Sequence, residues 1–336
     1  NPNINFFKLG PKIIKLIINY RKTKWLEKKL IKNGLIEEYN NMLNKKNEVL
    51  LMSDAEAIKT KKIVAMTTTG CAKYSTILEQ SNFEVIIIEE AAEVLEPHVL
   101  SLLTKNTKQL IMIGDHKQLK PKPYSFDLVL KYNFDVSMFE RLINNKIPYA
   151  TLKYQRRMKP MFADFVRIIY GDSDYKDYDD VKNKEKVKGM ENDMYIITHN
   201  KPEGEDKALK SKYNAYEAEY IVRLCKYLNQ QGYNENQITL LTFYVGQVLL
   251  IRKYMKKDGL NNFRVCSVDN YQGEECDIIL LSLVRSNEKN EIGFLRTFNR
   301  VCVAFSRAKI GLYVIGNIDA IIKGETNQNK KRNNID

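Results

Sequence analysis

The chain has 336 residues, of which 44% are hydrophobic and 28% are charged, and it contains 20 Tyr and 13 Phe. This composition excludes an intrinsically disordered chain and allows one large domain or two ordinary ones. Lys and Arg number 54 against 41 Asp and Glu, a net charge of +13 that favours a polyanion as partner. Residues 1–62 hold 14 Lys or Arg and 6 Asp or Glu, so +8 of the net charge lies there. A solvated helix face would explain this positive charge as well as a polyanion-binding surface does.

Cysteine and histidine spacing predicts no zinc site. The five cysteines are Cys71, Cys225, Cys266, Cys276 and Cys302. No two of them are spaced as C-x-x-C, and His98, His116 and His199 do not lie at metal-ligand spacing from them. Buried reduced thiols suit an intracellular protein. The expected location is the cytoplasm, with the nucleus as a second possible site. The longest apolar run, 278–284, is much shorter than the ~20 residues of a membrane helix, so no membrane association is expected.

Hydrophobic spacing predicts a helical segment followed by an α/β fold. Residues 11–62 have apolar positions near a 3.6-residue period, so residues 1–62 are taken as one helical segment. Predicted buried strands follow at 63–66, 85–88, 110–113, 238–241, 264–268, 277–283 and 312–315. Predicted helices lie at 93–103, 216–228, 245–255 and 299–309. Strands that are apolar on both sides and alternate with helices predict parallel sheets covered on both faces.

Two segments interrupt this alternation. Residues 171–212 are polar and rich in Asp, Lys and Tyr, which predicts a surface connection around a short strand at 194–198. Residues 321–336 are predicted to be a disordered tail.

A pair of acids follows the apolar run Val85–Ile88. Glu89 and Glu90 come directly after this predicted strand, and ligands bind at the carboxyl ends of strands in open α/β sheets. One acid there can hold Mg²⁺ through water, and a second can orient an attacking water. Acids also favour helix N-termini, so a solvated helix start is the alternative interpretation.

A second polar segment follows the next predicted strand, 110–113. Gly114 permits a tight exit, and Asp115 and Gln118 place polar side chains beside the first pair of acids. A neutral amide such as that of Gln118 can contact a γ-phosphate without competing for the metal. A surface turn would use the same residues, but a strand followed by two acids and then a strand followed by GDxxQLxP is a rare combination.

Here the sequence resembles superfamily 1 helicases of the Up-frameshift type. The two segments above match their Walker B and sensor motifs, and further motifs follow in order at 152–160 (LKYQRRMKP), 242–247 (TFYVGQ), 268–277 (VDNYQGEECD) and 299–309 (NRVCVAFSRAK). The segments at 66–74, 89–96 and 278–287 are similar to the NF-X-type zinc-finger-containing helicases. The resemblance implies two RecA-like parallel-sheet lobes, the first incomplete at 63–146 and the second at 147–320, preceded by a helical insertion at 1–62.

The resemblance also implies roles in ATP hydrolysis. Glu89 would serve Mg²⁺, Glu90 would activate the water, and Gln118 would contact the γ-phosphate. Arg157 and Arg307 would act as arginine fingers, since a guanidinium stays charged and forks onto phosphate oxygens. As isolated residues, both arginines would be expected in ordinary surface ion pairs.

Other residues of these motifs are expected to bind the nucleotide. They are Glu89, Asp115, Arg156, Gly273 and Glu275. Most of the wider family carries an aromatic residue at the position of Arg156, where it can stack on adenine, and Asp-Glu in place of Glu89-Glu90. Guanidinium stacking on a ring is possible, but base selectivity is then open.

Nucleic-acid contacts are expected on the opposite face of the lobes. Thr67, Thr68 and Thr69 follow the predicted strand at 63–66, and their hydroxyl and N–H groups can hold phosphates without reading bases. Threonine is also a good strand former, which is the alternative. Tyr244 and Gln247 are further candidates, and Tyr244 would either stack on a base or lie in the core.

The motif GxxxxGK[ST], which cradles the β- and γ-phosphates, does not occur in the chain. We therefore expect negligible ATPase activity from these residues alone, and we expect a fragment of a longer product, since the chain begins Asn1-Pro2 without Met. The predicted function is an ATP-dependent RNA helicase in RNA silencing or RNA surveillance. It would bind ATP, Mg²⁺ and single-stranded RNA, with RNA-silencing proteins as partners. A DNA helicase and an inactive RNA-binding scaffold remain alternatives.

Overall fold

The computed structural model describes residues 36–171 and 174–332. They divide into two compact units. The first unit contains the chain up to Ile88 and the segment Glu96–Ile111, and the second contains Glu89–Leu95 and the chain from Met112 onward. The first part of the predicted helical segment 1–62 lies outside the described residues.

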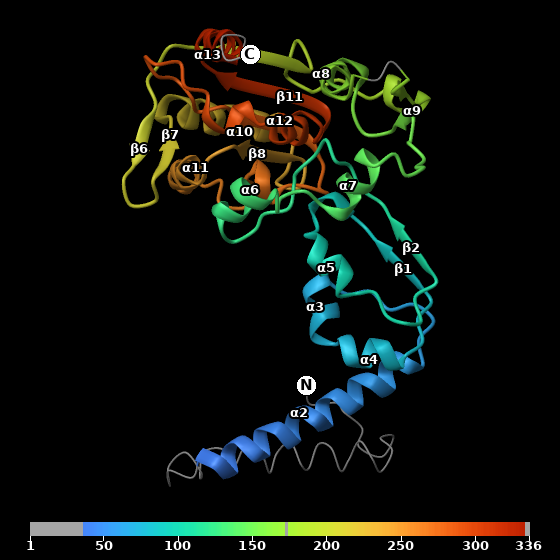
Figure 1. Ribbon diagram of the computed structural model, residues 1–336. Helices are drawn as coiled ribbons and strands as arrows, with labels where there is room; N and C mark the ends of the chain where they lie inside the picture. Colours follow the sequence, from blue (N-terminus) through green and yellow to red (C-terminus); the bar gives the residue numbers. More distant parts are fainter. Residues whose placement is uncertain (1–35, 172–173, 333–336) are drawn as a thin grey trace. The chain divides into compact units, whose positions relative to one another are not determined.

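The first unit is mainly helical, with one pair of strands (Figure 1). Its elements are α2 (Ile36–Lys59), α3 (Thr68–Lys73), α4 (Ser75–Gln80), β1 (Val85–Ile88), α5 (Glu96–Leu100) and β2 (Gln109–Met112). Strands β1 and β2 are neighbours in a two-stranded sheet. The predicted helix within 1–62 and the two predicted strands therefore occur where the apolar patterns indicate them.

The strand predicted at 63–66 is wrong, because these residues form no regular element. Ile63 is 86% exposed, so this apolar run does not enter a sheet. Thr67 instead caps α3, and its hydroxyl oxygen accepts a hydrogen bond from the N–H of Gly70 at 3.1 Å. A threonine hydroxyl competes well for a free helical N–H, which ends the extended run before α3.

The second unit is built on a five-stranded parallel sheet, as the sequence predicts. Its strands, in spatial order, are β5 (Met194–Thr198), β11 (Ala308–Gly316), β10 (Cys276–Ser282), β8 (Ile238–Thr242) and β9 (Arg264–Ser267). Every residue of β8 is buried and nearly every residue of β10, which is why both strands read as continuous apolar runs.

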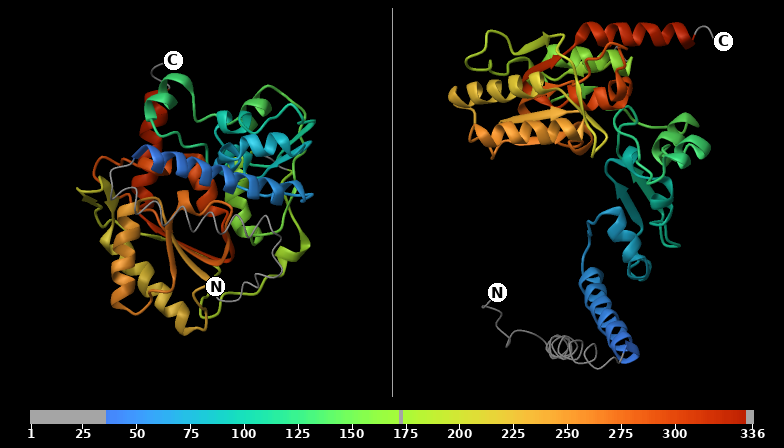
Figure 2. Two further views of the ribbon diagram at one scale, coloured as in Figure 1. Left: turned by 90° about the horizontal axis from the view of Figure 1, so that it is seen from below. Right: turned by 90° about the vertical axis from the view of Figure 1, so that its left-hand side faces the viewer.

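Helices cover both faces of this sheet (Figures 1 and 2). Successive strand side chains alternate between faces, so Leu241 and Ile279 join one core cluster and Leu240 and Ile278 join the other. The first cluster includes residues of α8 (Pro160–Tyr170) and α12 (Phe298–Phe305), and the second includes residues of α10 (Ala215–Gln230) and α11 (Val245–Lys257). This two-layered covering confirms the predicted α/β class.

The remaining elements of the second unit are short, apart from one C-terminal helix, and those labelled η are 3-10 helices. They are η2 (Ala91–Glu93), α6 (Phe126–Tyr132), α7 (Met138–Asn144), β3 (Tyr154–Gln155), β4 (Lys176–Asp177), α9 (Asp179–Lys182), β6 (Gly204–Asp206), β7 (Ser211–Tyr213), η3 (Val268–Asn270), η4 (Gly293–Arg296) and α13 (Ile318–Arg332). Strands β6 and β7 form an antiparallel hairpin.

The predicted disordered tail at 321–336 is wrong over its described part, because α13 continues to Arg332. The side chain of Asn317 accepts a hydrogen bond from the N–H of Ala320 at 3.0 Å, and Ile318 and Ile321 pack against the core. These anchors order a segment whose polar composition alone favours disorder.

Two further outcomes concern segment boundaries. The short strand predicted at 194–198 within the surface connection 171–212 is confirmed as β5, and it is an edge strand of the main sheet. The predicted lobe boundary between 146 and 147 differs from the compact units, in which residues from Met112 onward belong to the second unit. Leu119 shows why: it is 3% exposed and lies in the same core cluster as Val303.

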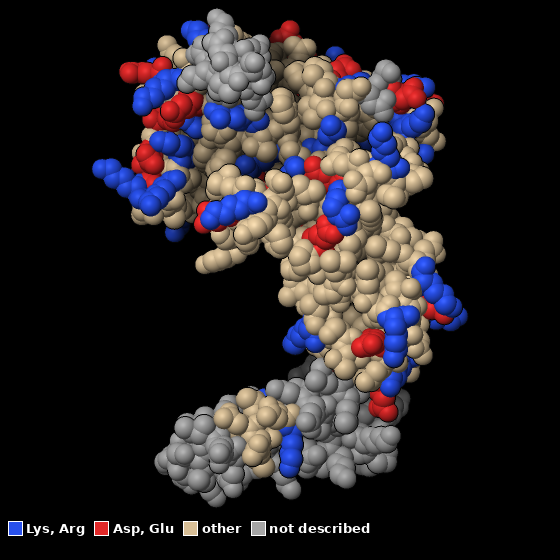
Figure 3. All heavy atoms as spheres, in the orientation of Figure 1, with Lys and Arg blue, Asp and Glu red and all other residues tan. Residues whose placement is uncertain are grey.

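The surface of the second unit carries charges of both signs. On the face drawn in Figure 3, Lys and Arg side chains lie among Asp and Glu side chains rather than in one cationic patch. Among the described helices, none is both long enough and apolar enough to span a bilayer.

Candidate active site

The pair of acids after β1 lies in a tight loop of the second unit. Glu90 has φ +52° and ψ +39°, a left-handed conformation that costs energy for a residue with a side chain. The next residue, Ala91, is buried, and its N–H donates to the carbonyl oxygen of Ile113 at 2.9 Å. Gly114 allows this approach, since a Cβ there would lie 2.9 Å from a backbone nitrogen of the loop. Packing therefore holds Glu90 in a strained but defined position.

Gln272 fixes the carboxylate of Glu90. Its amide nitrogen donates to Glu90 Oε2 at 3.0 Å, and its amide oxygen accepts from the N–H of Leu119 at 3.0 Å. The neighbouring Gly273 has φ +77°, and a Cβ there would lie 3.8 Å from Glu90 Oε1. One side chain thus ties together the loop after β1, the loop after β2 and the segment before β10.

Arg307 is a buried cation held only by neutral acceptors within the described part of the chain. It is 1% exposed and donates to the carbonyl oxygens of Val303 and Glu274, to the Ser306 hydroxyl, and to Gln118 Oε1 at 3.0 Å. Burial lowers the pKa of Arg307 to about 10, and the nearby charge of Arg157 adds to this effect. A buried guanidinium without a carboxylate partner favours an incoming anion.

Arg157 lies beside this buried cation but has an acidic partner. Its Nε donates to Glu275 Oε2 at 2.6 Å, and Lys309 Nζ approaches the other oxygen of Glu275 at 2.9 Å. These hydrogen bonds lower the pKa of Glu275 to about 2, so Glu275 remains ionised. Arg157 is only partly buried, with a side chain that is 30% exposed.

Asp115 orients the amide of Gln118. The amide nitrogen of Gln118 donates to Asp115 Oδ2 at 2.8 Å, which directs the amide oxygen to Arg307. Asp115 also accepts from the hydroxyl of Tyr170, and the pKa of this phenol is raised by its burial and by the nearby charge of Asp115. Asn299 completes the arrangement by donating to the carbonyl oxygen of His116 at 3.1 Å.

Some of these side chains line a cavity of about 310 Å³, but Glu90 and Gln272 are not among them. Its lining residues include Gln118, Arg156, Arg157, Glu275 and Arg307. Three arginines and an amide therefore line one concave space together with the carboxylate of Glu275, and cationic and amide groups gathered in this way can bind a phosphate group. Glu89 is exposed at the carboxyl end of β1, where its carboxylate can ligate a hydrated Mg²⁺.

Comparison with known proteins places the chain in a family. Two family models, each described as an AAA domain, match residues 16–125 and 134–319. The second match spans more than half of the chain. The chain belongs to the AAA domain family. Its similarities place it with the superfamily 1 helicases of the Up-frameshift type within that family.

Three curated helicase-family relatives illustrate the similarity. The mouse protein named NFX1-type zinc finger-containing protein 1 is 45% identical over 287 residues, which are 85% of this chain and 15% of that protein. The Schizosaccharomyces pombe protein named Helicase required for RNAi-mediated heterochromatin assembly 1 is 41% identical over 265 residues, 77% of this chain and 26% of that protein. The Saccharomyces cerevisiae ATP-dependent helicase NAM7 is 29% identical over 316 residues, 86% of this chain and 32% of that protein. The chain therefore spans less than a third of the length of each.

Two side chains that hold this site together were not selected by the sequence analysis. Gln272 and Asn299 link segments that are more than 150 residues apart in the chain. Both lie inside motifs that the sequence identifies, so the signal was present. Their hydrogen-bond partners depend on the tertiary fold, which the motifs alone do not report.

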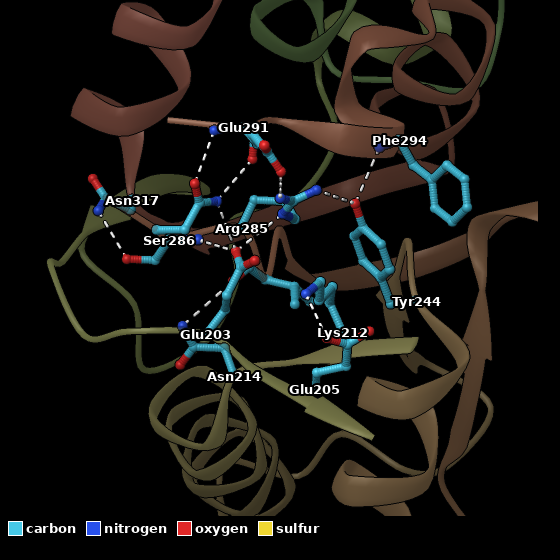
Figure 4. A network of polar contacts seen from close by, with 12 residues as sticks. Glu203, Glu205, Lys212, Asn214, Tyr244, Arg285, Ser286, Glu291, Phe294 and Asn317 are labelled. Atoms are coloured by element: carbon cyan, nitrogen blue, oxygen red, sulfur yellow. Dashed lines mark hydrogen bonds and ion pairs between the residues drawn. The ribbon is translucent and has the colours of Figure 1, made fainter. Parts of the chain in front are cut away.

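The two residues of the second unit that are predicted to bind nucleic acid, Tyr244 and Gln247, are buried, and Figure 4 shows the surroundings of Tyr244. Their role in binding nucleic acid stays a prediction. Gln247 is fully buried, and its amide nitrogen donates to the Ser282 hydroxyl at 2.9 Å. Tyr244 is 5% exposed, and its hydroxyl accepts from the N–H of Phe294 at 3.0 Å and from Arg285 at 3.3 Å. Both side chains hold the loops at the carboxyl edge of the sheet, because buried polar groups must find partners there.

The predicted threonines of the first unit begin helix α3. Thr67 provides the cap, and Thr68 and Thr69 are its first two residues. Hydroxyl and N–H groups at a helix start can contact phosphates, so their role in binding nucleic acid stays a prediction.

Proposed function

We propose that this chain forms part of an ATP-dependent helicase that moves on single-stranded RNA. Glu90 would activate the attacking water, Gln118 would contact the γ-phosphate, and Arg157 and Arg307 would stabilise the charge that develops on it. Glu89 would hold Mg²⁺, which supplies charge neutralisation at the phosphates when bound.

The observation that carries this proposal is the environment of Arg307. Its guanidinium is buried without a carboxylate partner in the described residues, yet it opens on a cavity that Arg157 and Gln118 also line. Keeping such a cation buried is costly unless an anion of high charge density binds beside it. A triphosphate supplies that anion, and the hydrogen bond from Arg307 to Gln118 links the cation to the residue expected to sense the γ-phosphate.

The acidic side of the site supports hydrolysis rather than binding alone. Glu90 is held by Gln272, while its other carboxylate oxygen has Gly273 as a neighbour that adds no side chain. That oxygen can therefore accept a proton from a water molecule. A protein that only bound an anion would not need an acid such as Glu90, held in a strained conformation, near Arg157 and Arg307.

The choice of RNA, and of silencing as the process, is supported by the relatives. One of them carries RNAi-mediated heterochromatin assembly in its name, and two carry the word helicase. We therefore propose single-stranded RNA as the track and RNA-silencing proteins as partners, in the cytoplasm and the nucleus. The experiment below must distinguish this preference for RNA from a preference for DNA.

The test is ATP turnover by the full-length gene product, with single-stranded RNA and DNA compared. Glu90→Gln should keep ATP binding and stop hydrolysis, and Arg307→Ala should lower kcat by ~10³-fold or more. Arg223→Ala provides the control, since Arg223 lies in an exposed ion pair with Glu219. Wild-type turnover by both site variants would reject the proposal, and stimulation by DNA alone would replace RNA with DNA.

The phosphate-cradling motif absent from these residues gives a separate check. The 336-residue chain by itself should show negligible ATPase activity, because the backbone N–H cradle and lysine of that motif are missing from its sequence. Turnover at the rate of an intact helicase by this chain would contradict the assignment.

A further inference from the structure

We propose that Tyr170 is a positioning residue for ATP hydrolysis, which acts through Asp115 to hold the amide of Gln118 toward the γ-phosphate. The inference rests on the proposed function and adds a residue that lies outside the helicase motifs of the sequence. Tyr170 is the last residue of α8. Its hydroxyl contacts one side chain from the loop after β2 and one from α12, the helix that precedes Arg307.

The carboxylate of Asp115 accepts hydrogen bonds from three neutral donors. Its Oδ1 accepts from the N–H of Lys117 at 2.9 Å. Its Oδ2 accepts from the amide nitrogen of Gln118 at 2.8 Å and also from the hydroxyl of Tyr170. Both carboxylate oxygens are therefore used to fix neighbouring groups, and Tyr170 is the donor that comes from outside the loop after β2.

The amide of Gln118 has one preferred orientation because its two ends have different partners. Its nitrogen donates to Asp115, and its oxygen accepts from Arg307 at 3.0 Å. A rotation of the amide by 180° would place its oxygen against a carboxylate and its nitrogen against a guanidinium, so both hydrogen bonds would be lost. Within the described residues, the second hydrogen of the amide nitrogen has no protein acceptor. This hydrogen remains for an oxygen of the γ-phosphate, provided that Asp115 stays in place.

The hydroxyl of Tyr170 acts on Asp115 rather than on the nucleotide. A phenol has a single hydrogen to donate, and that of Tyr170 is donated to Asp115. The hydroxyl oxygen lies 3.9 Å from the sulfur of Cys302, whose thiol can donate only a weak hydrogen bond to it. Burial raises the pKa of this phenol, so it stays protonated and remains a donor at neutral pH. A neutral donor fixes the carboxylate without adding a charge beside the triphosphate.

The ring of Tyr170 is held by packing that does not involve its hydroxyl. Its centroid lies 5.3 Å from that of the Tyr175 ring, and Tyr170 packs against the first core cluster. Gly171 ends α8 directly after it, with φ +63° and an N–H that donates to the carbonyl oxygen of Arg167 at 2.9 Å. Glycine adopts this left-handed conformation without a steric penalty. Replacing the phenol by a phenyl ring should therefore keep the packing and remove only the hydrogen bond to Asp115.

Tyr170→Phe is the variant that separates the hydroxyl from the ring. We expect kcat for ATP to fall about 5- to 20-fold, because Asp115 loses one of its donors and releases the amide of Gln118. KM for ATP should change by less than about twofold, since the contact with the γ-phosphate matters most in the transition state. Tyr227→Phe is the matched control. It removes a tyrosine hydroxyl that donates to the carbonyl oxygen of Gly189 at 2.7 Å, and it should leave both constants unchanged.

A double-mutant cycle distinguishes this role from a general structural one. Gln118→Ala alone should lower the rate of hydrolysis by more than Tyr170→Phe does. If Tyr170 acts through Gln118, adding Tyr170→Phe to Gln118→Ala should lower the rate further by less than about twofold. A loss of packing would instead add its full effect in both backgrounds. Single-turnover hydrolysis of labelled ATP, with the enzyme in excess, gives the four rates.

The experiment uses the full-length protein at saturating single-stranded RNA, and each outcome has one meaning. A lower kcat in Tyr170→Phe that disappears in the Gln118→Ala background supports the inference. An unchanged kcat, a rise in KM alone, or equal losses in the two backgrounds would overturn it while leaving ATP-driven movement intact. Absence of ATP turnover by the wild-type protein would instead overturn the proposed function, and the role of Tyr170 with it.

Discussion

Glu203→Gln removes one partner of a buried ion pair at the carboxyl edge of the main sheet (Figure 4). Glu203 and Arg285 have side chains that are 9% and 7% exposed, and Arg285 Nε donates to Glu203 Oε2 at 3.0 Å. The same carboxylate oxygen accepts from the N–H of Ser286 at 2.7 Å and from the Asn287 amide at 3.1 Å. Burial would lower the pKa of Arg285, but the hydrogen bonds that Arg285 donates to Tyr244 and Glu203 outweigh this effect, and the pKa is raised.

The expected cost follows from what remains around the arginine. Leaving a buried charge without its partner costs about 3–5 kcal/mol. Glu291 lies 3.7 Å from Arg285 but is 63% exposed, so it offsets only a small part. We therefore expect Glu203→Gln to lower the free energy of unfolding by ~2–4 kcal/mol, which corresponds to a fall in Tm of roughly 5–15 °C for a unit of this size.

The assay is urea and thermal unfolding of the 336-residue chain, monitored by circular dichroism. Glu291→Gln is the matched control, because it removes the exposed neighbour of the same guanidinium and should cost less than ~1 kcal/mol. Glu203→Gln combined with Arg285→Met should recover part of the loss, since no buried charge is then left alone. Equal, small effects of Glu203→Gln and Glu291→Gln would refute the assignment of this pair as a buried structural charge pair.

Three other substitutions test neighbouring features. Gly293→Ala should destabilise the fold by about 3 kcal/mol or more, since φ is +53° and the new Cβ would lie 2.1 Å from a guanidinium nitrogen of Arg285. Gly259→Ala is the control in the same unfolding assay. It has φ +71° but open space around it, so it should cost only ~1–2 kcal/mol. Gln272→Ala should lower kcat of the full-length protein by about 10- to 100-fold by releasing Glu90, and an unchanged kcat would show that the contact does not position the acid. The low pKa of Glu275 means that its ion pairs stabilise the fold above its ordinary pKa of 4.5 and lose this effect as pH falls toward 2. The stability difference between wild type and Glu275→Gln should therefore be present at pH 6 and vanish near pH 2, and a pH-independent difference would contradict the pairing.

Local pattern was sufficient for the motif order of this chain and for its buried strands, although it also predicted a strand at 63–66 that does not form. Strands β8 and β10 are apolar on both faces because helices cover both faces of the sheet, and such runs are visible in any sequence. The motifs around Glu90 and Gln118 were also readable, since each combines a strand end with residue types that phosphate chemistry requires, and the motif of Arg307 was readable from its residue types. These features depend on short-range spacing, which the chain carries without its fold.

Tertiary structure decided which polar groups are available to ligands and which are used inside the protein. Gln247 resembles a surface ligand in sequence, yet the alignment of Ser282 with Thr242 in neighbouring strands brings the Ser282 hydroxyl beside its amide in the interior. Arg307 resembles one half of a surface ion pair, yet the fold surrounds it with neutral acceptors and an amide 189 residues earlier in the chain. The burial of a polar side chain and the identity of its hydrogen-bond partners depend on which distant segments of the chain come into contact. Hydrophobic periodicity and motif spacing describe only nearby residues, so they do not report these contacts.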